Sequence, residues 1–70
     1  MDGGLRMSAL AVKDTILVVD PDSYGYGEVG KIIKEDVNVI TRKPIYRVKF
    51  KNRNMHPVWL AEARLMRYSA

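Results

Sequence analysis

Apolar and basic residues alternate along one stretch of the chain, IYRVKFKNRN at residues 45–54. The apolar set is Tyr46, Val48 and Phe50, and the basic set between them is Arg47, Lys49 and Lys51. A period of two residues is typical of an antiparallel strand with one buried face. We therefore expect the apolar set to face the core and the basic set to face solvent.

Two further strands are expected on the N-terminal side. Residues 16–19 are all apolar, and the run ends at Asp20-Pro21-Asp22-Ser23, where Pro21 suits the second position of a turn. Residues 28–36 (EVGKIIKED) predict the next strand, but their apolar residues do not alternate, so Gly30 is expected to mark a bulge. Residues 37–44 (VNVITRKP) fit either an extension of that strand or a turn.

The C-terminal stretch HPVWLAEARLMRY, residues 56–68, allows two interpretations. Propensity favours a helix, with Trp59, Ala63 and Met66 roughly on one face. The alternative is a short strand at 58–60, a single 3₁₀ turn at 61–63 and a last strand at 64–68. We favour the alternative, because the other strands need closing partners and a lone short helix offers one face for packing.

Five short strands about ten residues apart predict an all-β fold, and closing them into a small barrel would remove exposed edges. Residues 1–12 are expected to be a flexible tail and residues 13–70 the barrel domain. No apolar run approaches the roughly 20 residues of a membrane helix, so no integral membrane segment is expected.

Composition argues against several kinds of site. The chain has no cysteine and one histidine, so we expect no disulfide, no metal site and no cofactor, and a reducing, cytoplasmic location. Asp20 and Asp22 are best explained as turn-capping residues, and His56 has no plausible serine partner. We expect no catalytic residue, no enzymatic activity and no small-molecule substrate.

The positive charge is confined to the second half of the chain. Residues 37–61 contain six basic residues and no acidic one, whereas residues 1–36 contain four basic and seven acidic residues. The six are Arg42, Lys43, Arg47, Lys49, Lys51 and Arg53. Such segregation attracts anionic surfaces, although a solvated outer strand face is the plainer alternative.

Three aromatic residues are candidates for partner contact. Tyr24 and Tyr26 alternate with glycines in the loop PDSYGYGEVG at residues 21–30, and Trp59 is expected to be half-buried. The tyrosines could instead fold back over the core.

The order of these elements resembles SH3-like barrels: a strand, a tyrosine-bearing loop, Glu-Val-Gly, a basic strand, and the VWLAEARLMRY ending. Within that group the loop is similar to the photosystem I subunit IV family at Pro21–Tyr24 and Glu28–Gly30. The resemblance implies a five-stranded barrel with one 3₁₀ turn before the last strand, acting as a binding module.

Two functions follow as hypotheses. The first is a non-enzymatic adaptor that docks on an acidic protein surface or larger cytosolic complex through the tyrosine loop, Trp59 and the basic segment. The second is a DNA- or RNA-binding barrel that places the basic residues on phosphates and a tyrosine on a base.

Overall fold

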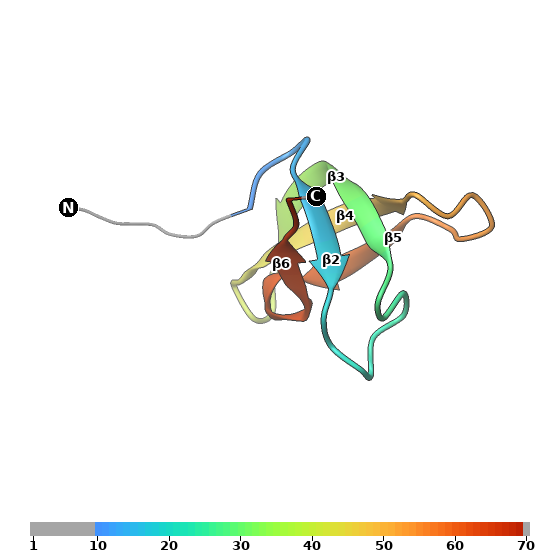
Figure 1. The fold of residues 1–70 in the computed structure, drawn as a ribbon. Helices are drawn as coiled ribbons and strands as arrows, with labels where there is room; N and C mark the ends of the chain where they lie inside the picture. Colours follow the sequence, from blue (N-terminus) through green and yellow to red (C-terminus); the bar gives the residue numbers. More distant parts are fainter. Residues whose placement is uncertain (1–9, 70) are drawn as a thin grey trace.

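The computed structural model describes residues 10–69 and contains five β-strands and one short 3₁₀ helix (Figure 1). The strands are β2 (Thr15–Val18), β3 (Val29–Val37), β4 (Pro44–Phe50), β5 (Val58–Ala61) and β6 (Leu65–Arg67), and η2 (Glu62–Arg64) joins the last two. The all-β class is thus confirmed, as is a single 3₁₀ turn before the last strand. No α-helix occurs among the residues described.

The strands form one antiparallel sheet in the order β5-β4-β3-β2-β6. Within residues 10–69 no pairing joins the two end strands, so the sheet is not closed into a barrel. The expectation of closure is therefore wrong, whereas the number of strands is right. The end strands have four and three residues, which leaves few backbone groups for a closing ladder.

The core lies against the inner face of the sheet. Its fully buried side chains are Ile16, Val18, Ile32, Tyr46 and Val48, and Phe50 is also buried. The alternation predicted for β4 is confirmed. Leu10, within the segment expected to be a tail, is buried in this core, while residues 1–9 lie outside the described residues.

The bulge in β3 lies at Ile33 and not at Gly30. Ile32 pairs with Val48 and Lys34 with Arg47, so the register shifts between them. Gly30 stays in regular register, opposite Ile16 and Phe50. A glycine is needed at position 30 because β3 and β4 approach each other closely there. A Cβ at this position would lie 2.6 Å from Val48 Cγ1 and 2.9 Å from the Lys49 carbonyl oxygen.

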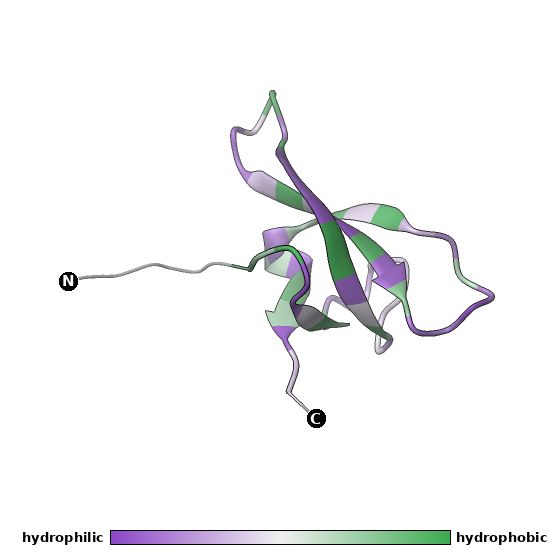
Figure 2. Ribbon diagram, turned by 90° about the horizontal axis from the view of Figure 1, so that it is seen from above, coloured by the Kyte–Doolittle hydropathy of each residue, from purple (hydrophilic) through white to green (hydrophobic). Residues whose placement is uncertain are grey.

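Two connections project from opposite ends of the β3–β4 region (Figure 1). The turn at 38–43 joins β3 to β4, so in the ambiguous stretch Val37 extends β3, residues 38–43 form the turn and Pro44 begins β4. The loop at 51–57 joins β4 to β5. In Figure 2 the loop is largely hydrophilic, whereas the tip of the turn is hydrophobic.

Candidate functional site

Two rows of side chains cross the outer face of the sheet. One row is Lys34, Arg47 and Trp59 on β3, β4 and β5. The other is Thr15, Lys31 and Lys49 on β2, β3 and β4. Paired residues of antiparallel strands share a face, so four cations collect here, and Lys51, the first residue after β4, lines the same hollow as Lys31 and Lys49 and brings the number to five. We call Lys31, Lys34, Arg47, Lys49 and Lys51 the basic face.

The bulge at Ile33 brings Lys31 and Lys34 onto the same face. Residues three apart in a regular strand point to opposite sides. The extra residue at Ile33 resets the alternation, so Lys34 pairs with outward-facing Arg47 while Lys31 pairs with outward-facing Lys49. Sequence reasoning missed both lysines because they belong to the acidic half of the chain. Pairing residues 28–36 with 45–51 as a hairpin would have found them.

A shallow hollow lies within the basic face. It has a volume of about 440 Å³ and is lined by Thr15, Val29, Gly30, Lys31, Lys49 and Lys51. Three lysines therefore surround a surface that also includes an apolar side chain and a bare glycine backbone. Such a hollow suits a ligand that has a flat apolar part and negative charges at its edge.

Trp59 and Arg47 contact each other beside the hollow. The guanidinium carbon of Arg47 lies 5.9 Å from the centroid of the Trp59 ring, within cation–π range. Trp59 as a whole residue is 39% exposed. Trp59 is thus an exposed residue and not the half-buried one expected, and it offers a flat aromatic surface next to the cations.

The lysines of the basic face are not neutralised by neighbouring carboxylates. Within residues 10–69 the ion pairs are Arg64–Asp20 at 3.2 Å and Arg67–Asp14 at 3.1 Å, and neither includes one of these lysines. One acidic residue, Asp36, shares the outer side of β3 further along, opposite Ile45. Its carboxylate accepts a hydrogen bond from the Val37 N–H at 2.7 Å.

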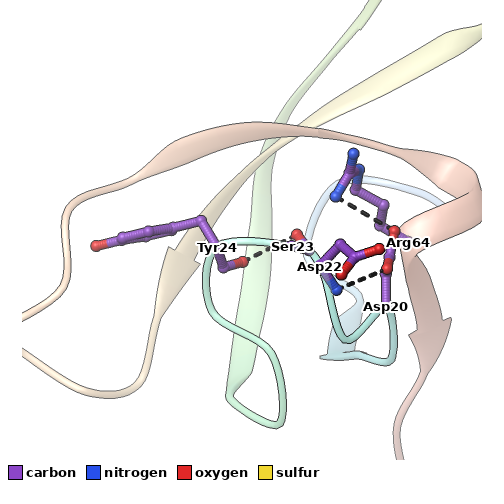
Figure 3. A network of polar contacts seen from close by, with 5 residues as sticks. All are labelled: Asp20, Asp22, Ser23, Tyr24 and Arg64. Atoms are coloured by element: carbon purple, nitrogen blue, oxygen red, sulfur yellow. Dashed lines mark hydrogen bonds and ion pairs between the residues drawn. The ribbon is translucent and has the colours of Figure 1, made fainter.

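Tyr24 connects two loops. Its ring packs edge-on against Phe50 with centroids 5.7 Å apart, and its hydroxyl accepts a hydrogen bond from the His56 N–H at 3.2 Å. Figure 3 shows the ring pointing away from the Asp20–Arg64 pair. Within the described part of the chain neither tyrosine makes a ring contact with Trp59, so the aromatic candidates do not form one cluster.

Tyr26 remains the more open of the two tyrosines, with 57% of its surface exposed against 47% for Tyr24. The glycine between them adopts φ +79°, and a Cβ on Gly25 would lie 2.5 Å from the Phe50 ring. The loop therefore turns back on itself, which ties Tyr24 to the core and leaves Tyr26 at the surface.

The preceding turn is capped by Asp20. Its side chain accepts a hydrogen bond from the Asp22 N–H at 2.9 Å, and its carbonyl accepts one from the Ser23 N–H at 3.0 Å. The ion pair with Arg64 joins this turn to η2 (Figure 3). The capping role predicted for Asp20 is confirmed. The one predicted for Asp22 is wrong, because among the described residues Asp22 contributes its backbone N–H to the turn and its side chain caps nothing.

The remaining three basic candidates lie at the two ends of β4. Arg42 and Lys43 belong to the turn at 38–43, and Arg53 belongs to the loop at 51–57. Seven residues of β4 separate the two sites, a span of about 24 Å. The six predicted cations therefore form a line along β4 and its flanks instead of one compact patch.

The described residues do not form a metal site or a membrane-spanning helix. Within 10–69 no group of three or more His, Asp or Glu side chains could hold a metal ion, and no helix is long and apolar enough to cross a membrane. Burial, followed by the negative charges of Glu62 and Glu35, raises the pKa of Tyr46 above its ordinary value of 10.0. Tyr46 points into the core and not toward the basic face.

Comparison with protein-family models, with curated proteins and with solved structures finds no match to this chain. The resemblance to SH3-like barrels and to the photosystem I subunit IV family therefore stays a prediction, and the function has to be argued from the surface itself.

Proposed function

We propose that this protein is a non-enzymatic nucleic-acid-binding module that uses the outer face of its sheet. One observation carries the proposal: five cations converge on that face from β3, β4 and the residue after β4, and no carboxylate of residues 10–69 pairs with the four lysines among them. Unpaired cations that share a face attract a polyanion and can displace its counterions.

The spacing of the basic face suits a sugar–phosphate backbone. Arg47, Lys49 and Lys51 follow each other at intervals of about 7 Å along the strand direction. Lys31 and Lys49 are cross-strand partners, about 5 Å apart. Trp59 can stack on a base beside them, because every base has an aromatic face.

The structure changes the balance between the two hypotheses. Two lysines that were not candidates join the basic face, which strengthens the case for a phosphate backbone. Tyr24 is engaged with Phe50 and His56, which leaves less aromatic surface in the loop for a protein partner. Docking on an acidic protein surface remains the second candidate, and the exposed Tyr26 ring favours it.

The single tryptophan gives a direct test. Trp59 fluorescence would be titrated with DNA and RNA oligonucleotides at several salt concentrations. We expect quenching, and a linear fall of log K with log salt whose slope is about −0.9 for each phosphate contacted on duplex DNA. Replacing Lys31, Lys49 and Lys51 together by Gln should make the slope shallower by about three.

Arg64→Gln is a control for a basic residue outside the basic face, because it removes one positive charge but lies in η2, paired with Asp20. It should leave the slope almost unchanged. If no oligonucleotide binds at low salt, the proposal is wrong. If an acidic protein binds instead and Tyr26→Ala weakens it, the second candidate takes its place.

A further inference from the structure

The tip of the β3–β4 turn exposes two large apolar side chains. Val39 and Ile40 are each 87% exposed, the highest values among the exposed large hydrophobic residues described. Figure 2 shows the hydrophobic tip at the end of a connection that stands away from the rest of the sheet. Side chains so exposed contribute almost nothing to the core, and the two together offer an apolar surface to a partner.

The turn that carries them is built by local hydrogen bonds. The Asn38 side-chain oxygen accepts from the N–H groups of Ile40 and Thr41, at 2.9 and 3.1 Å. The Asn38 carbonyl accepts a hydrogen bond from the Arg42 N–H at 2.7 Å, and the Asn38 N–H donates one to the Lys43 carbonyl at 2.9 Å. The tip is therefore organised before any partner binds, which lowers the entropy cost of binding.

Positive charge returns at the tip, beyond Asp36, which interrupts it on the outer side of β3. Arg42 and Lys43 flank the two apolar residues on the β4 side, and Lys34 and Arg47 form the nearest row of the basic face. The β3–β4 ribbon is thus a basic arm with an apolar end. A partner that suits this arrangement must present phosphates along its length and a gap for aliphatic side chains at one point.

We propose that Val39 and Ile40 form a wedge that enters between base pairs of a bound duplex, while Arg42, Lys43 and the basic face hold the phosphates on either side. This inference rests on the proposed function. Apolar wedges partly unstack a base step and kink the duplex, typically by about 20–90°. The seven residues of β4 span about 24 Å, or roughly seven base pairs at 3.4 Å each.

If the wedge enters the duplex, the duplex should bend, whereas binding to the basic face alone predicts no bend. A duplex labelled with a donor and an acceptor fluorophore at its two ends should show shorter end-to-end distances when the protein binds. Val39→Ser combined with Ile40→Ser should abolish the bend and weaken duplex binding by about tenfold or more, since two aliphatic side chains lose their burial. The slope of log K against log salt should not change, because no phosphate contact is removed.

Two controls accompany this double variant. Val12→Ser makes a similar apolar-to-polar change at an exposed position before β2, and it should leave bending and affinity unchanged. The thermal midpoint of the double variant should also equal that of the natural chain, because the bonds of the turn use backbone groups of Ile40 and not its side chain.

The outcomes separate the two proposals. If duplexes bind with the expected salt slope but neither bend nor affinity depends on the tip, the wedge is wrong and the basic face stands. If the double variant loses affinity for single strands as much as for duplexes, the tip is not a wedge between base pairs. Binding of the tip to anionic lipid vesicles, with no effect of the double variant on duplexes, would also overturn the wedge. If no nucleic acid binds at all, the proposed function itself fails.

Discussion

The hydroxyl of Tyr24 accepts a hydrogen bond from the backbone N–H of His56, 32 residues further along the chain. The same tyrosine packs edge-on against Phe50 at the end of β4. One side chain therefore holds the loop between β2 and β3 against the loop between β4 and β5. Tyr24 is a structural residue as well as a surface one.

Substitution of Tyr24 should therefore lower stability. Tyr24→Phe removes the hydrogen bond and should lower the free energy of unfolding by about 0.5–1.5 kcal/mol. Tyr24→Ala also removes the aromatic pair with Phe50, so the free energy of unfolding should fall by about a further 0.5–1.5 kcal/mol. Urea denaturation, monitored by Trp59 fluorescence, measures the loss of stability in both Tyr24 variants. Tyr26→Ala is the matched control and should change stability by less than about 0.5 kcal/mol; equal effects of the two alanine variants would contradict this role for Tyr24.

Asp36 should weaken nucleic-acid binding, because it is the acidic residue on the outer side of the β3–β4 ribbon. Asp36→Asn removes the negative charge, and its side-chain oxygen can still accept from the Val37 N–H. We expect affinity for a duplex to rise a few-fold at low salt and the gain to disappear at high salt, where surface charges are screened. Asp22→Asn, in the turn before Tyr24, serves as the charge-matched control. Lower affinity of the Asp36 variant would contradict the placement of the duplex on this face.

Gly30→Ala should destabilise the fold, because the added Cβ would meet Val48 Cγ1 and the Lys49 backbone. Overpacking of this kind typically costs about 1–3 kcal/mol. The cost should be smaller when Gly30→Ala is introduced into a Val48→Ala background, because one of the two close contacts is then gone. A double-mutant cycle by urea denaturation measures the difference, and an unchanged cost would place the strain elsewhere.

Stability should fall at alkaline pH through Tyr46. Burial raises the pKa of Tyr46, so the unfolded chain releases this proton at a lower pH than the folded chain does. The contribution of Tyr46 is constant below pH 10 and is lost as pH rises from 10.0 toward the raised value, by at most about 1.4 kcal/mol per pH unit. The variant Tyr46→Phe should lack this part of the pH dependence when free energies of unfolding are compared at pH 8 to 11. Parallel curves for the two proteins would show that Tyr46 does not contribute.

Much of the fold follows from local patterns in the sequence. The alternation over residues 45–51 predicted both faces of β4, and the turn chemistry of Asp20-Pro21-Asp22 predicted the end of β2. The strand, 3₁₀ turn and strand at the C-terminus were favoured over a helix on the ground that other strands needed partners. In the first two cases the deciding signal lies within about ten residues of the element it predicts, whereas the third was decided by the needs of the other strands against the local helix propensity.

Contacts between residues far apart in the chain could not be predicted from the sequence. Gly30 was the natural site for a bulge, because glycine is common at bulges, but its small size serves the close approach of β4 instead. Closure of a barrel depends on whether the first and last strands of the sheet meet, which no local pattern reports. The expectation about Tyr24 was left open, because its partner His56 lies far along the chain.

The basic face was predicted in part. Arg47, Lys49 and Lys51 were found from alternation alone. Lys31 and Lys34 were missed, because charge was counted along the chain, whereas the sheet combines residues from its acidic and basic halves. The register shift at Ile33 also hides the common orientation of these two lysines from any search based on a period of two.

The self-contained turn at residues 38–43 has a consequence for how this protein can change during evolution. Asn38 and backbone groups fix the shape of the turn, whereas the side chains of Val39 and Ile40 take no part in the core. Substitutions at these two positions should be almost free of folding cost. Relatives of this protein could therefore acquire new binding preferences at the tip while the sheet beneath it stays the same.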